Sequence, residues 1–155
     1  MYRKYFKRLI DLIVSTLSMP FLIFIILIVG IIIKMEDKGP VFYLADRLGK
    51  NGNTYRMYKF RTMKVNAPDI RNEDGSTFSS DNDPRLLKAG KFFRQTSIDE
   101  LPQLINVFLG DMSIIGPRPD LPEHIHQYTE FHSIQEYEHN LFLQLSQRFH
   151  HYLHH

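Results

Sequence analysis

No cysteine occurs in this 155-residue sequence, so neither a disulfide framework nor a thiolate metal site can form. The sequence also lacks a glycine-rich phosphate loop, a Ser-His-Asp order and a nucleic-acid motif, so we expect no nucleic-acid partner. The formal net charge is only +2, and so small a total indicates no particular partner. The informative feature is therefore where apolar and charged residues lie along a chain long enough for one domain with a core.

The longest apolar block runs from Leu12 to Ile33, 22 residues without a formal charge. As a straight helix it would be about 33 Å long, close to the thickness of a bilayer core. A buried core helix rarely runs this long without a polar face, and a signal peptide has a shorter apolar region and a small-residue cleavage site. This block instead continues through Gly30 into Lys34 and Glu36. We therefore predict that it inserts into a membrane.

Positive charge flanks the apolar block on both sides. The flanking cations are Arg3, Lys4, Lys7 and Arg8 before it and Lys34, Lys38, Arg47 and Lys50 after it. Because basic flanks stay in the cytoplasm, and no second apolar block brings the chain back, we expect both ends on the cytoplasmic side. Pro20 removes a backbone donor inside the block, and the nearby Ser18 can bond a freed carbonyl. The pattern favours a re-entrant helix broken near Pro20, with a kinked single span as the open alternative.

The residues after the block predict a small β-hairpin. Val41–Leu44 and Thr54–Met63 are rich in β-branched and aromatic residues, and they enclose the turn signal Gly49-Lys50-Asn51-Gly52. Lys59 and Arg61 fall on one face of the second strand, since side chains alternate along a strand. Two cations on one face can hold a phosphate, although an ordinary solvated face gives the same pattern.

Helical patterns account for much of the rest. The polar segment Val65–Pro84 predicts a long loop. We expect a short helix over Arg85–Arg94, and apolar residues at helical spacing predict another over Leu101–Phe108, ended by Gly110. An amphipathic helix is expected after Ser133. The predicted fold class is α+β and mostly helical.

Asp99 and Glu100 are adjacent carboxylates just ahead of the second predicted helix. With Ser97 they have the Ser-x-x-Glu form of a capping box, and acids are favoured at a helix N-terminus. Spacing alone favours this capping role. The functional alternative is that the two acids share a divalent cation and that one of them acts as a nucleophile.

Two arginines are candidate phosphate ligands. Arg94 lies five residues before Asp99, and Arg118 is held between Pro117 and Pro119. A guanidinium fixed by a rigid turn suits a phosphate or a nucleobase, because its planar fork loses little freedom on binding. A surface ion pair is the alternative for Arg118.

Several segments together carry a family resemblance. In order they are Phe6–Asp11, Tyr58–Met63, Asp83–Arg85, Phe93–Val107 and Gly110–Pro119. Each alone is a weak signal, but in this order and spacing the chain resembles the bacterial sugar transferase family, the monotopic phosphoglycosyl transferases. The resemblance covers about Lys7 to Tyr128. It departs at Met19, where the family usually has Ser directly before the proline, and in the last 27 residues, where an expected Pro-Gly-Ile-Thr-Gly-like stretch is missing.

The resemblance implies a specific chemistry. Asp99 would be the nucleophile and Glu100 its partner carboxylate, with Mg²⁺ bound by both and by the donor's pyrophosphate. Asp99 would attack the sugar-bearing phosphorus of a UDP-sugar, release UMP and pass the sugar phosphate to undecaprenyl phosphate. Lys59, Arg61, Arg94 and Arg118 would contact the substrates. The expected role is initiation of a capsule, exopolysaccharide, O-antigen or glycoprotein glycan.

The resemblance also implies a location and an organisation. The expected site is the cytoplasmic face of a bacterial inner membrane, with inner-membrane lipids as partners and a homodimer left open. The expected segments are the basic N-terminus and re-entrant helix at 1–38, a cytosolic catalytic domain at 39–128, and a divergent tail at 129–155. Because of that tail, a catalytically impaired membrane-surface relative that binds lipid or partner proteins is the alternative function. A single-span anchor carrying an extracytoplasmic binding module fits less well, because positive charge follows the apolar block.

Overall fold

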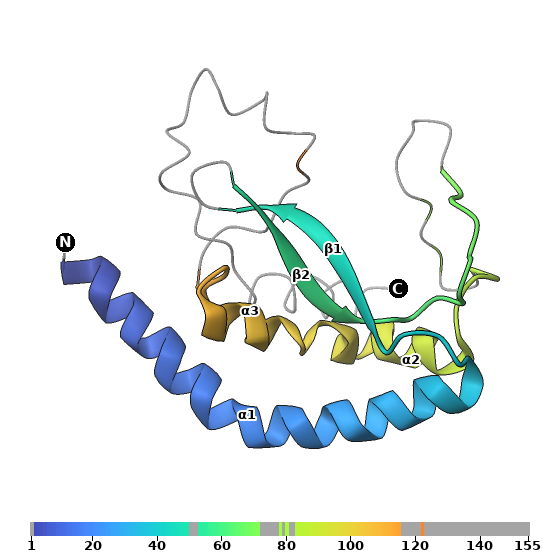
Figure 1. Cartoon of the computed structure of the whole chain (residues 1–155), viewed down its shortest axis with the longest axis horizontal. Helices are drawn as coiled ribbons and strands as arrows, with labels where there is room; N and C mark the ends of the chain where they lie inside the picture. Colours follow the sequence, from blue (N-terminus) through green and yellow to red (C-terminus); the bar gives the residue numbers. More distant parts are fainter. Residues whose placement is uncertain are drawn as a thin grey trace.

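The fold combines one long helix, a two-stranded hairpin and short helices, as the computed structural model in Figure 1 shows. The structure describes residues 2–49, 53–71, 78, 80, 83–115 and 122, and the side chains from Tyr5 onward. The elements are α1 (Tyr2–Glu36), β1 (Phe42–Leu48), β2 (Thr54–Phe60), α2 (Lys88–Gln95), the 3₁₀ helix η2 (Ile98–Glu100) and α3 (Gln103–Leu109). The predicted α+β class is confirmed.

The hairpin pairs β1 and β2 antiparallel, from Phe42 opposite Phe60 to Leu48 opposite Thr54. The buried residues of each strand lie three positions apart, so both faces of the hairpin carry buried side chains. The rings of Phe42 and Phe60 stack at 5.6 Å between centroids. β2 ends at Phe60, which places Arg61 beyond the strand rather than on the face that was predicted to carry Lys59 and Arg61 together.

Two apolar clusters hold the fold together, and β2 contributes to both. One contains Val29, Ile33, Phe60, Leu87 and Phe93, and the other contains Ala45, Met57, Val107 and Met112. Phe60 is 1% exposed and Met57 is fully buried. Because a buried Phe→Ala change costs about 3–5 kcal/mol, β2 is the element whose apolar side chains anchor both α1 and α3.

Helix α1 is continuous through Pro20 and bends along its length, so the expected break is a bend inside one helix (Figure 1). Ser15 Oγ donates to the Asp11 carbonyl at 2.6 Å, and Ser18 Oγ donates to the Val14 carbonyl at 2.8 Å. Such back-bonding to the preceding turn bends helices, and Pro20 adds the loss of its own donor. Ser18 was predicted to bond a carbonyl freed by Pro20, but its partner is the Val14 carbonyl and not that of Thr16, which Pro20 leaves without its helical donor.

One side of α1 is buried against the rest of the protein, and the other carries exposed apolar side chains. Asp11, Ser15, Leu22, Val29 and Ile33 are at most 4% exposed, at spacings of four and seven residues that mark one helical face. Large residues of the other side remain open, among them Leu17, Phe21, Phe24, Leu27 and Met35. Within the described residues, α1 is the one helix long and apolar enough to cross a membrane. Insertion and re-entrant geometry stay predictions.

The short helices differ slightly from their predicted bounds. α2 begins at Lys88, three residues later than expected, because Leu86 forms a β-bridge with Met63 and the backbone of Leu87 is extended. α3 ends as predicted at Gly110, whose φ of 99° is a left-handed value that favours glycine. The amphipathic helix expected after Ser133 lies outside the described residues.

Candidate active site

The candidate site is built around Asp99 and Glu100 in η2, which packs on β2 and α2. Both carboxylates are buried, with exposures of 3% and 2%. Lys59 on β2 reaches across, and its Nζ donates to Glu100 Oε1 at 2.9 Å. The structure thus joins the acid pair, through Glu100, to Lys59, which lies 41 positions before Glu100 in the sequence.

The capping-box interpretation of Ser97 and Glu100 is wrong. Ser97 is the N-cap of η2, but its side chain makes no capping hydrogen bond, and its φ of 57° is left-handed. The Glu100 N–H donates to the main-chain carbonyl of Ser97 at 3.1 Å, while the Glu100 carboxylate accepts from Lys59. The acid pair therefore lies in the first turn of a helical segment, where acids are favoured, but it forms no capping box.

The acid pair fits a divalent cation that arrives with a phosphate ligand. Within the described residues, no group of three or more His, Asp or Glu side chains is placed to hold a metal. Mg²⁺ does not require such a cage, since it is commonly bound by one or two carboxylates together with substrate phosphates and water. Asp99 and Glu100 match that donor set, and Lys59 offsets part of their mutual repulsion.

Two further polar side chains of this segment are buried and were missed by the sequence analysis. Gln103 is fully buried and Ser97 is 2% exposed. Across the described part of the chain, neither the Gln103 amide nor the Ser97 hydroxyl has a hydrogen-bond partner. A buried polar group left in this state costs about 1–3 kcal/mol of stability. The available signal was spacing, because Gln103 follows Asp99 by four residues and Glu100 by three.

Asn106, one turn further along α3, is equally buried but fully bonded. Its Oδ1 accepts from the Tyr58 N–H at 2.9 Å, and its Nδ2 donates to the Arg56 carbonyl at 2.8 Å. The side chain thereby mimics a neighbouring strand along β2. This contact fixes the strand on α3 immediately before Lys59, so it positions the ammonium that faces Glu100.

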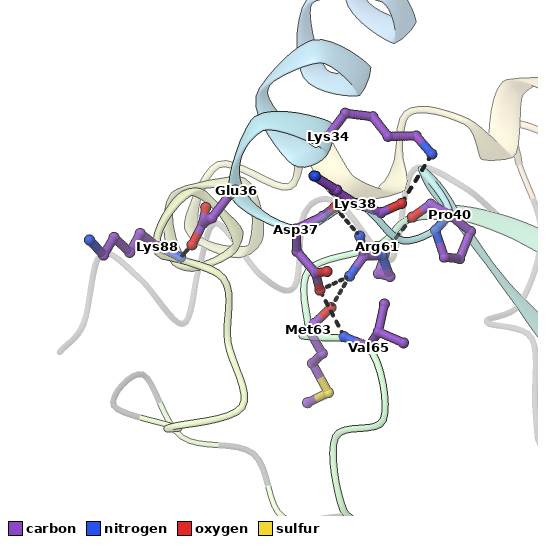
Figure 2. A network of polar contacts seen from close by, with 9 residues as sticks. All are labelled: Lys34, Glu36, Asp37, Lys38, Pro40, Arg61, Met63, Val65 and Lys88. Carbon is purple, nitrogen blue, oxygen red and sulfur yellow. Dashed lines mark hydrogen bonds and ion pairs between the residues drawn. The ribbon is translucent and has the colours of Figure 1, made fainter.

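Arg61 is placed in a different network from Lys59, as Figure 2 shows. Its Nη1 donates to Asp37 Oδ2 at 2.6 Å and to the Met63 carbonyl at 2.9 Å, and its other bonds reach the main chain of Asp37 and Pro40. The side chain is buried, with 8% exposure. Arg61 therefore joins the end of α1 to the end of β2, and a substrate contact would require these bonds to break.

Asp37 is held ionised in this network. The backbone N–H of Val65 lowers the pKa of the Asp37 carboxyl, and the hydrogen bond from Arg61 lowers it further. Beside it, the Glu36 carboxylate accepts from the N–H groups of Lys88 and Ala89, so it caps the start of α2 (Figure 2). These contacts fasten the C-terminal end of α1 to the body.

The N-terminal half of α1 is fastened as well. Arg8 donates from Nη1 to the Val107 carbonyl at 2.6 Å and from Nη2 to the Phe108 carbonyl at 2.8 Å, at the C-terminal end of α3. Asp11 Oδ1 accepts from the Ile114 N–H at 3.0 Å. The apolar stretch of α1 is therefore tied to the same body at both of its ends.

The remaining predicted residues fall in two groups. Arg94 lies near the end of α2, and its Nε donates to Thr62 Oγ1 at 3.0 Å. Arg118 and the tail at 129–155 lie outside the described residues. The substrate contacts of Arg94 and Arg118 stay predictions.

Comparison with known proteins identifies relatives. The family model described as "Bacterial sugar transferase" matches residues 2–149, which includes most of the segment expected to diverge. A UDP-glucose:undecaprenyl-phosphate glucose-1-phosphate transferase of Klebsiella pneumoniae is 43% identical over 79% of this chain and 26% of its own length. The enzyme of the same name from Escherichia coli strain K12 is 40% identical over 80% of this chain and 26% of its own length.

A third relative has a different sugar in its name. The UDP-N-acetylgalactosamine-undecaprenyl-phosphate N-acetylgalactosaminephosphotransferase of Aeromonas hydrophila is 37% identical over 87% of this chain and 31% of its own length. The chain therefore spans between a quarter and a third of the length of these three relatives.

Proposed function

This chain belongs to the bacterial sugar transferase family, and from that membership we propose that it transfers a sugar 1-phosphate from a UDP-sugar to undecaprenyl phosphate. The relatives named above act on UDP-sugars and undecaprenyl phosphate by their names, which supports both substrates. The observation that carries the proposal is the buried acid pair, in which Glu100 bonds Lys59 instead of forming a capping box with Ser97. The product would initiate a capsule, exopolysaccharide, O-antigen or glycoprotein glycan.

The proposed reaction has two half-reactions at Asp99. In the first, an Asp99 carboxylate oxygen forms a bond to the sugar-bearing phosphorus, and the bond from that phosphorus to the bridging oxygen breaks. UMP leaves with the electron pair. In the second, a phosphate oxygen of undecaprenyl phosphate attacks the same phosphorus, and Asp99 leaves as a free carboxylate. Burial of the pair limits hydrolysis between the two steps, because it keeps water from the intermediate.

Each protein group has a distinct part in this proposal. Lys59 holds Glu100 beside the nucleophile, and Arg94 and Arg118 are the candidate ligands of the donor's phosphates. Asp99 and Glu100 would hold Mg²⁺, which when bound neutralises the donor's pyrophosphate and favours departure of UMP. Arg61 is given no substrate contact in this proposal, because its N–H donors bond residues at the ends of α1 and β2.

The proposed location is the cytoplasmic face of a bacterial inner membrane, with α1 re-entrant. Arg8 and Asp11 tie one end of its apolar stretch to the body, and Glu36 and Asp37 tie the other. Because one folded polar body cannot lie on both sides of a bilayer, both ends of the apolar stretch are expected on the same side. These ties therefore support a re-entrant helix rather than a kinked helix that spans the membrane. The apolar side chains left open on the other side of α1 would face lipid.

A covalent-adduct experiment tests the chemistry. The purified protein is incubated with UDP-glucose or UDP-N-acetylgalactosamine and Mg²⁺, without lipid acceptor, and its peptides are weighed by mass spectrometry. We expect the mass of one sugar phosphate on the peptide that contains Asp99, and UMP in solution. Asp99→Asn should lose both, while Asp46→Asn, on the exposed surface of β1, should keep both. Turnover by the Asp99→Asn protein near the parent rate would remove the nucleophile assignment.

A further inference from the structure

We infer that Gln103 is a positioning residue for Asp99 and Glu100, with an amide that hydrogen-bonds the acid pair in the donor-bound protein. The inference rests on the proposed function, and it adds a residue whose side chain has no partner in the described part of the chain. Gln103 opens α3 three residues after Glu100, and the hydrogen bonds of this turn have the three-residue period that puts Gln103 on the side of Glu100.

The first argument is the contrast between Gln103 and Asn106. Both are primary amides on α3, three residues apart, and both have 0% exposure. Asn106 bonds the Tyr58 N–H and the Arg56 carbonyl, whereas neither the oxygen nor the nitrogen of the Gln103 amide is bonded within the described residues. An amide buried in this way destabilises the fold relative to an apolar side chain of the same shape. Packing alone would therefore favour methionine at position 103.

The second argument is that Ser97, which precedes the acid pair in the sequence, also destabilises the folded protein. Its backbone is left-handed at φ 57° and ψ 17°, a conformation that a non-glycine residue adopts at a cost. Its hydroxyl is also buried without a partner among the described residues. Backbone strain and unmatched polar atoms thus bracket Asp99 and Glu100 closely, and strain of this kind clusters at active sites.

The acid pair gives the amide its expected partner. Two adjacent carboxylates present four oxygens, and Lys59 holds one of them at 2.9 Å. When a donor phosphate and Mg²⁺ engage the pair, its carboxylates must turn toward them. The Gln103 N–H groups can then bond a carboxylate oxygen from behind and fix that orientation. The amide contacts the pair and not the substrate, which is why it acts as a positioning residue.

The test compares Gln103→Met with Asn106→Leu, which remove one amide each from the same helix. The first measurement is Tm of the purified protein without ligand. We expect Gln103→Met to raise Tm by roughly 2–5 °C, because it replaces an unbonded buried amide, and Asn106→Leu to lower it, because it breaks bonds to β2. A fall in Tm for Gln103→Met would show that the amide is a structural contact and would overturn the inference.

The second measurement is the rise in Tm on adding UDP-glucose or UDP-N-acetylgalactosamine with Mg²⁺, followed by kinetics of UMP release. Gln103→Met should gain less stability from donor and Mg²⁺ than the parent. Its kcat should fall by about a hundredfold with little change in KM, as expected for misplaced catalytic groups. Unchanged kcat would overturn the inference.

Ser97→Gly provides a second variant, since it keeps the left-handed backbone without strain and removes the hydroxyl. It should raise Tm and slow the reaction. A fall in Tm would contradict the argument that Ser97, like Gln103, destabilises the free protein. If the parent is stabilised by donor and Mg²⁺ but releases no UMP, the proposed function fails while the difference in stabilisation still decides the inference. If donor and Mg²⁺ leave the parent's Tm unchanged, both are overturned.

Discussion

The ion pair between Lys59 and Glu100 can be measured with a double-mutant cycle of Lys59→Met and Glu100→Gln. Removing one partner of a fully buried pair costs about 3–5 kcal/mol, because the other charge stays buried without compensation. The Lys59 side chain is 16% exposed and Glu100 only 3%, so water solvates part of the site, and we expect a loss of about 2–3 kcal/mol for Lys59→Met. At about 2–4 °C per kcal/mol, this lowers Tm by about 4–12 °C.

The cycle separates this pair from the general effect of each substitution. In the double variant both charges are gone, so it should be more stable than the sum of the single losses predicts, by a coupling energy of about 1–3 kcal/mol. Lys38→Met, at an exposed lysine, is the control and should stay within about 0.5 kcal/mol of the parent. The parent, the two single variants, the double variant and the control are unfolded thermally in the same detergent. Additive losses would show that Lys59 and Glu100 are not coupled and would refute the geometry proposed for the site.

Three other predictions address the rest of the structure. Arg61→Gln should lower Tm while the KM for a UDP-sugar stays unchanged, and a raised KM with unchanged Tm would return Arg61 to the substrate site. The hydrogen bond from Arg85 lowers the pKa of the Asp83 carboxyl in the folded protein. The Asp83–Arg85 pair therefore stabilises the fold fully at pH values above the unfolded pKa of about 3.9. This stabilisation is lost as the pH falls through the lower pKa that Asp83 has in the folded protein. Asp83→Asn should therefore lose less Tm than the parent between pH 5 and pH 2, and equal losses would contradict this. Cysteines placed at positions 2 and 50 should both be labelled from the cytoplasmic side only, and labelling from opposite sides would establish a span.

The sequence predicts those features that depend on near neighbours. The hairpin follows from β-branched and aromatic residues around a turn signal, and α3 follows from helical spacing. Gly110 ends α3 because its φ is positive. The same local reasoning failed for Arg61, because it extended a strand period past Phe60. The partner of Arg61 is Asp37, which is 24 residues away, and no spacing rule indicates it.

In the candidate site, too, some features follow from neighbouring residues in the sequence and others depend on the folded structure. Asp99 and Glu100 were found from their adjacency, but the capping box failed because a left-handed Ser97 turns its hydroxyl out of capping geometry, which only the folded backbone determines. The unmatched amide of Gln103 depends on what surrounds it in three dimensions. Arg8 and Asp11 have partners about 100 residues away, so their role was invisible in the sequence pattern.

These distant partners of α1 set an order of events during synthesis. The helix is made before the other described elements, and the carbonyl of Val107 that fastens Arg8 belongs to a residue made 99 positions later. At about 5–20 residues per second, the ribosome needs about 5–20 s to supply it. During that interval the apolar block of α1 has no body to pack against, and a bilayer is the surface on which it can be buried. The helix is therefore expected to reach the membrane first, and the later residues then fold onto a helix that is already in place.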